Sequence, residues 1–410
     1  MAPSDYRLSH APHRDLEAEA LLALGRLDGT LGTVGLTTLR LFTIRLLRDL
    51  LVAALRQEGY MFTDQRFNAW FAGLTTLSDH PPHSGRPPRV LCEAILIELR
   101  HSSWDLLAAL ASRFQVALLA PNDYLASDHV GSNHPGSGLA AETAHQDTHA
   151  LVTAARGLLG GLPPFSHPLT ALAHLHRAAG ANVQFAPPER APEPITMGSI
   201  RLTVERAAAP SPRWALEMLW GEHWYAAKLL AHALPFPGLI RLDALRAGQS
   251  TDPGDLDETP TILATALRDV AQGLCGDLIE AERLARRLKD TPPGKRRTSR
   301  APALLELLSG FGPLRSAQLE TLLGVTRIGL RTMLGALDAV GMINRTTLAG
   351  VHLYAVNLDA RAADDASDLT ANSSLSSAAL GEFDAAMADI DALLARKGIN
   401  LDEADEDSEP

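Results

Sequence analysis

The residues whose types and spacing best suit a specific chemistry follow a predicted turn at Gly324–Val325. The stretch GVTRIGLRTMLGALDAVGMI (324–343) carries leucines at helical spacing, which leaves a second set of side chains pointing outward at the front of the helix. An arginine at such a position can pair with a guanine edge or with a phosphate. The pattern therefore predicts contacts to double-stranded DNA by Thr326, Arg327, Ile328, Arg331 and Thr332.

Basic and polar residues on both sides of this helix extend the predicted contact surface. The stretch INRTTLAGVHLYAV (343–356) predicts two short strands, on which Arg345, Thr346, Thr347 and His352 are suited to backbone or minor-groove contacts. Upstream, the linker KRRTSR (295–300) follows two prolines and a glycine that end a helix. We expect this arm to follow phosphates through Lys295, Arg296 and Arg297.

Two histidines raise the question of a metal site. His145 and His149 lie four residues apart in AETAHQDTHA, with Glu142 one turn earlier, and this spacing can bind zinc. The HExxH pattern of metalloproteases is absent, so we interpret the three residues as the polar face of a helix. No P-loop, glycine-rich nucleotide fingerprint, CxxC pair or GxSxG elbow is present either. The sequence predicts no catalytic residue, no metal and no cofactor.

The elements that would position the DNA-contacting residues occupy 301–357. A first helix is predicted over 301–312, a second over 316–324 with Ser316 as its cap, and a third that begins after Thr326. Leucines of all three helices, together with Val340, Met342 and Ile343, are expected to form their common core. Three helices followed by a hairpin predict a winged helix-turn-helix. A winged helix that binds protein instead of DNA is the alternative.

The remainder of the chain is predicted to be mainly α-helical. Helices are expected within 15–58 with a break near 29–35, and over 64–77, 89–118 and 260–289, while 199–207 is the best candidate strand. The tryptophan-rich stretch 213–230 is interpreted as a well-packed helix or an interface, with core packing favoured over a ligand cage. The predicted organisation is a helical module (1–186), a second helical part with possible short strands (187–290), a basic linker (291–300), the winged helix-turn-helix (301–357) and a disordered acidic tail with one amphipathic helix (358–410).

Charge is distributed unevenly around a net value of −11. Residues 283–357 contain twelve Lys and Arg against four Asp and Glu, whereas 358–410 contain three basic residues against fourteen acidic ones. A basic block beside the predicted reading helix favours a polyanionic partner for that region alone. No apolar run is long enough for a membrane span and no apolar signal core opens the chain, so we expect a cytoplasmic protein without membrane contacts.

Four stretches resemble a family of plasmid-borne proteins of rhizobia and related alpha-proteobacteria. They are ALLALGRLDGTL (20–31), PPRVLCEAILIEL (87–99), SRAPALLELL (299–308) and FDAAMADIDALLAR (383–396). The resemblance implies an uncharacterised helical domain ahead of a DNA-binding helix-turn-helix, with no established reaction. A weaker similarity connects the chain to Fic-type AMP-transferases. The nearest string to their active loop, HPPHSGRPPR (80–89), lacks the phenylalanine, the acidic position and the Gly-Asn-Gly turn that holds phosphates.

These observations predict a sequence-specific DNA-binding protein, a transcriptional regulator linked to plasmid or mobile-element functions. One short reading helix contacts only a short half-site, so a homodimer is expected, and an effector of unknown chemistry is possible. Two alternatives stay open. The helical module could have an enzymatic or toxin-like activity that the wing domain autoregulates, or the chain could be a protein-binding scaffold.

Overall fold

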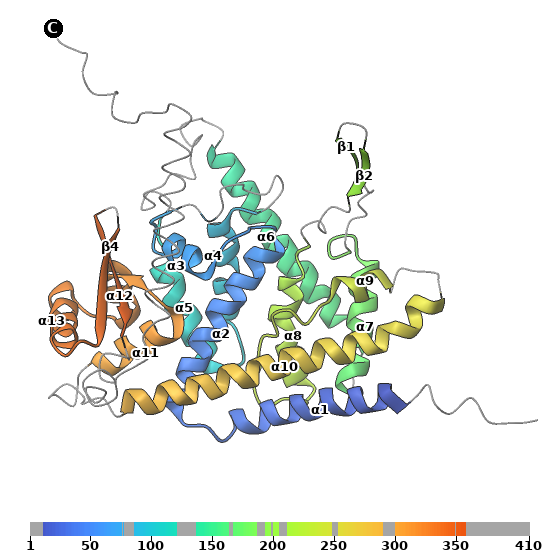
Figure 1. Cartoon of the computed structure of the whole chain (residues 1–410), viewed down its shortest axis with the longest axis horizontal. Coiled ribbons are helices and arrows are strands. Elements are labelled where there is room, and N and C mark those ends of the chain that lie inside the picture. Colours follow the sequence, from blue (N-terminus) through green and yellow to red (C-terminus); the bar gives the residue numbers. More distant parts are fainter. Residues whose placement is uncertain are drawn as a thin grey trace, which may run out of the picture. The chain divides into compact units, whose positions relative to one another are not determined.

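The computed structural model describes residues 11–75, 77, 86–120, 137–163, 167–186, 193–197, 200–204, 211–247, 253–289, 300–348 and 350–357. One compact unit contains all of them (Figure 1). The helices are α1 (Ala11–Leu31), α2 (Leu36–Gln57), α3 (Asp64–Phe71), α4 (Pro88–Leu99), α5 (Asp105–Ala117), α6 (Ser137–Gly160), α7 (Pro168–Ala181), α8 (Trp214–Ala226), α9 (Leu242–Ala247), α10 (Pro253–Lys289), α11 (Ala301–Phe311), α12 (Ser316–Leu323) and α13 (Arg327–Asp338). The strands are β1 (Glu193–Met197), β2 (Ile200–Val204), β3 (Leu314–Arg315), β4 (Ile343–Leu348) and β5 (Val351–Val356).

The described part of the chain is mainly α-helical, as the apolar spacing predicted. The break expected within 15–58 lies between α1 and α2, and the helical stretch predicted over 89–118 is divided into α4 and α5, with Trp104 directly before α5. The helix predicted over 64–77 is shorter, because Gly73 adopts a positive φ of 77° and the amide of Leu74 donates to the carbonyl of Ala69 (2.9 Å). None of the described helices combines the length and apolar character that crossing a bilayer requires.

The longest helix, α10, packs along α1 (Figure 1). Its buried side chains recur three or four residues apart, as in Leu267, Ala271, Leu274 and Leu278, and therefore form one stripe. The helix begins seven residues before the predicted start at Pro260, with Pro253 at its first position, where a missing N–H costs nothing. Helix α10 also packs against α2, α7, α9 and α11.

Helix α2 lies at the centre of the packing and contacts α10, α11, α5, α8 and α4. Helical spacing in the sequence places Phe42, Leu46 and Leu50 on one apolar stripe, and all three are buried. The structure also buries other faces, including Leu41 and Thr43. A helix with neighbours on several sides must be apolar around most of its circumference, and this burial is not visible as a stripe.

The tryptophan-rich helix α8 is part of the core, which confirms that interpretation. Trp214, Trp220 and Trp224 are fully buried. Glu217, also buried, accepts hydrogen bonds from Gln57 Nε2 (2.8 Å) and from the backbone amides of Gly238 (2.8 Å) and Ile240 (2.9 Å). These three hydrogen bonds give both oxygens of the buried carboxyl group a donor and join α2, α8 and the segment after α8.

Strand β2 lies within the predicted strand 199–207 and pairs antiparallel with β1, with Ile195 opposite Leu202. The partner strand β1 overlaps the proline-rich stretch 187–194, where only a domain division was expected. Pro194 is tolerated there because a two-stranded hairpin has only edge strands.

Residues 300–348 and 350–357 form three helices and a three-stranded antiparallel sheet with strand order β3-β5-β4. In the sheet, Leu314 pairs with Tyr354 and Thr346 with Leu353. Strand β3 was not predicted from the sequence, since two residues carry no periodicity. The predicted leucines are buried, as are Met342 and Ile343, but Val340 is 56% exposed and does not belong to the core. It follows the end of α13, where the chain turns at Gly341.

Ser316 is not the cap of α12, contrary to the prediction. It is the first residue of the helix, and Arg315 occupies the N-cap position. The side chain of Gln318 accepts a hydrogen bond from the Arg315 amide (3.3 Å) and so satisfies one of the free N–H groups there. The linker residues Lys295, Arg296 and Arg297, the predicted tail 358–410 and most of the loop 79–88 lie outside the described residues.

Candidate nucleic-acid interface

The start of α13 is determined by two local features that the sequence predicted. Gly324 ends α12 in the left-handed conformation (φ 62°, ψ 43°), which glycine adopts without steric cost. Thr326 then caps α13, because its Oγ1 accepts a hydrogen bond from the Gly329 amide (3.2 Å). A single residue, Val325, therefore separates the helix end from the next cap, and the angle between α12 and α13 is closely constrained.

The two faces of α13 differ sharply. Leu330, Leu334 and Leu337 are buried at 1 to 8% exposure and pack the helix onto its neighbours. The five residues predicted to contact DNA lie at the first turns and are all exposed to solvent: Thr326, Arg327, Ile328, Arg331 and Thr332. Ile328 is 79% exposed, the highest value on this helix among large apolar side chains. The hydroxyl of Thr332 donates to the Ile328 carbonyl (3.0 Å).

Neither Arg327 nor Arg331 forms an ion pair with any acidic side chain that the structure describes. Other exposed arginines do, for example Arg286 with Glu282 and Arg56 with Asp64. An exposed guanidinium without an internal partner keeps all of its donors for an external acceptor. The front of α13 is thus a cationic surface with free hydrogen-bonding capacity.

The hairpin β4–β5 brings Arg345, Thr347 and His352 together. Arg345 Nη2 lies 3.3 Å from His352 Nε2, and Thr347 Oγ1 lies 2.8 Å from His352 Nδ1. Thr347 is paired with His352 across the strands, and Arg345 is two residues before Thr347, so the three side chains share one face of the hairpin. The sequence singled out all three residues, together with Thr346, for contacts to the DNA backbone or minor groove.

The helices that carry α13 are packed against α2, α3 and α5. Phe311, at the end of α11, is fully buried, and its ring centroid lies 4.6 Å from that of Phe114 and 4.7 Å from that of Phe71. Gly310 approaches α2 so closely that an added Cβ would lie 2.9 Å from Ile44 Cβ. The main neighbours of α13 itself are α12 and β4 (Figure 1). Residues 301–357 therefore share a core with the helical part, while the outer face of α13 stays exposed to solvent.

A buried amide strengthens this joint. Gln318 is 1% exposed, and its Nε2 donates to the carbonyl of Phe71 (2.9 Å), the last residue of α3. Helix ends leave such carbonyls without an intrahelical donor, so Gln318 satisfies one of them. The sequence analysis missed this role because the two residues are 247 positions apart.

We expect Gln318→Leu to lower the free energy of unfolding by about 1–3 kcal/mol, because the buried carbonyl of Phe71 loses the donor that Gln318 supplies. Urea unfolding followed by circular dichroism measures the change. The matched control is Thr321→Val on the same helix, which removes an exposed hydrogen bond to the Ala317 carbonyl (3.0 Å) and should change stability by less than about 0.5 kcal/mol. Equal effects of the two substitutions would contradict the assignment.

The histidines of α6 are not brought together with further ligands. His145 Nε2 lies 4.0 Å from Glu93 Oε2, and Glu142 accepts from Gln146 Nε2 (3.3 Å). Among the residues that the structure describes, no group of three His, Cys, Asp or Glu side chains could hold a metal ion. His145 and Glu142 therefore have protein partners of their own.

Comparison with known proteins identified no relative of this chain. No protein-family model and no curated protein matches the chain.

Proposed function

We propose that the chain is a sequence-specific DNA-binding protein, a transcriptional regulator in which 301–357 form a winged helix-turn-helix and α13 reads the major groove. The observation that carries the proposal is the front of α13, where Arg327 and Arg331 are exposed above a buried row of leucines and form no ion pair with the acidic side chains that the structure describes. Arginine pairs with the O6 and N7 atoms of guanine through two parallel hydrogen bonds, which few other side chains can do.

The surroundings of α13 support the same proposal. The hairpin with Arg345 and His352 is suited to phosphate or minor-groove contacts, and the basic linker at Lys295, Arg296 and Arg297 to non-specific attraction. Because one reading helix covers a short half-site, we propose that a cytoplasmic homodimer binds two half-sites related by symmetry. The resemblance to plasmid-borne proteins supports a role in plasmid or mobile-element functions.

Selection of bound DNA from a random duplex library with the full chain tests the proposal. We expect one enriched motif that contains a guanine in each half-site, arranged as an inverted repeat if the dimer forms. Mobility shift on the enriched duplex and on a shuffled duplex of the same composition measures specificity. A specific site is expected to bind at least a thousandfold more tightly than the shuffled one at physiological salt.

Two outcomes would overturn the proposal. Enrichment of no sequence, or equal affinity for the enriched and the shuffled duplex, would exclude base reading by α13. The exposed Ile328 would then favour a protein partner for this face, since a solvent-exposed apolar side chain can anchor such a contact.

A further inference from the structure

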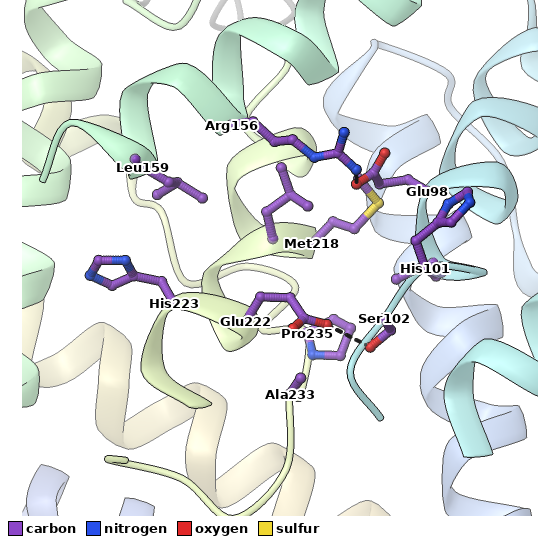
Figure 2. Close-up of a pocket in the computed structure, with 13 residues that line it drawn as sticks. Glu98, His101, Ser102, Arg156, Leu159, Met218, Glu222, His223, Ala233 and Pro235 are labelled. Carbon is purple, nitrogen blue, oxygen red and sulfur yellow. Dashed lines mark hydrogen bonds and ion pairs between the residues drawn. The ribbon is translucent and has the colours of Figure 1, made fainter. Parts of the chain in front are cut away.

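A cavity of about 340 Å³ lies in the helical part of the chain, outside the face of α13. Its walls come from the end of α4, the last turns of α6, α8 and the segment 233–235 (Figure 2). Ligand pockets in proteins usually have volumes of about 300–1,000 Å³, so this cavity has the size for a small molecule.

The apolar part of the wall consists of side chains that are almost fully buried. Leu159 is 7% exposed, Met218 2% and Leu219 8%, and Pro235 lies beside them in the lining. Figure 2 shows Met218 between the Glu98 and Arg156 side chains on one side and Glu222 on the other. A ligand that fills this space must therefore carry an apolar body.

The polar part of the wall has more negative than positive charge. Glu98 and Arg156 form an ion pair with each other, which satisfies both groups. Glu222 has no cationic partner among the described side chains, and its Oε1 accepts hydrogen bonds from Ser102 Oγ (2.7 Å) and from the Ser103 amide (2.8 Å). No described donor forms a hydrogen bond with its second oxygen, Oε2. Burial lowers the pKa of His223, so this histidine adds no positive charge near neutral pH.

We propose that this cavity binds a small organic amine, an ammonium group on an apolar or aromatic body of about ten heavy atoms. The ammonium would donate to Glu222 Oε2, and the body would contact Met218 and Leu159. An ammonium group supplies a hydrogen-bond donor for Oε2 and a positive charge, neither of which the described side chains provide there, and such charge-assisted bonds are stronger than neutral ones.

The position of Glu222 also connects the cavity to the DNA-binding face. Ser102 and Ser103, which Glu222 holds, lead directly into α5, and Phe114 near the other end of α5 stacks on Phe311. A ligand that restrains Glu222 therefore orders the start of α5, the helix against which α12 and Phe311 of α11 pack. The role of the cavity as an effector site for DNA binding rests on the proposed function, whereas the binding of an amine in the cavity does not.

Isothermal titration calorimetry of the full chain, without DNA, tests the binding site. The probe is 2-phenylethylamine, and 2-phenylethanol is a neutral control of nearly the same shape. We expect one amine per chain and at least about tenfold weaker binding of the alcohol, as expected for loss of a hydrogen bond to a charged group. Glu222→Gln retains acceptors for Ser102 and Ser103 and should remove the preference for the amine. Glu93→Gln, a carboxylate on α4 that pairs with Arg89 outside the cavity, should leave it unchanged.

Hydrogen exchange with and without the amine tests the connection to α5. We expect added protection over 101–117 that extends to α12, whatever the outcome of the DNA experiments. Equal binding of amine and alcohol, or no heat of binding up to millimolar amine, would overturn the proposed site. Binding that protects only residues lining the cavity would overturn the connection and leave the site intact.

Discussion

Replacing Phe311 with alanine is expected to lower the free energy of unfolding by about 3–5 kcal/mol, the range for a phenylalanine removed from a well-packed core. The ring is fully buried and lies against Phe71, Phe114 and, at 6.2 Å between centroids, Phe67. Its loss leaves a cavity where α11 meets α3 and α5, and the neighbouring rings are held on these two helices, which cannot easily collapse into it. Urea unfolding of the purified variant, followed by circular dichroism, measures the change.

Val340→Ala is the matched control for this substitution. Val340 is also in the C-terminal described segment but is 56% exposed, so its truncation should cost less than about 0.5 kcal/mol. If Phe311→Ala is no more destabilising than Val340→Ala, residues 301–357 do not pack on the helical part in solution as they do in this structure. DNA affinity would then have to be explained without a rigid joint.

Replacing Arg327 or Arg331 with alanine is expected to weaken binding to the preferred DNA site by about 1–3 kcal/mol, which corresponds to roughly 5- to 150-fold in Kd. Both side chains are exposed on the first turns of α13, where a helix in the major groove reaches base edges. Binding to the shuffled duplex should change less, because a base contact contributes only on the matching sequence. Mobility shift on both duplexes at fixed salt measures the difference.

Substitutions of matched charge separate base contacts from general attraction. Arg327→Lys keeps the positive charge but loses the planar, bidentate donor pair, so it should reduce sequence preference while retaining binding to any DNA. Joint replacement of Lys295, Arg296 and Arg297 by alanine should weaken binding on all sequences alike and reduce the salt dependence by about 0.9 per lost phosphate contact. Arg283→Ala on α10, whose guanidinium pairs with Glu280, serves as a distant control.

One pattern of results would refute a reading role for α13. If Arg327→Ala and Arg331→Ala both bind the preferred and shuffled duplexes as the parent chain does, while circular dichroism shows an unchanged fold, the exposed arginines make no base contact. The helix would then be a structural element with a basic surface.

The features that the sequence determined by itself are local ones. Gly324, Thr326 and the leucine spacing of 327–338 act within one or two turns of helix, so the end of α12, the cap of α13 and its inner and outer faces were predictable. Helix formation depends mainly on such short-range capping and periodicity. The two strands of the hairpin were predictable for the same reason.

Only the tertiary structure shows how residues 301–357 pack against the helical part. Phe311 meets Phe71 and Phe114 across about 200 residues or more of chain, and the amide of Gln318 completes the end of α3. The same holds for the cavity, where Glu222 of α8 meets Ser102 before α5. Contacts between distant residues leave no periodic signal in a single sequence, because each side chain is compatible with many neighbours until packing selects one.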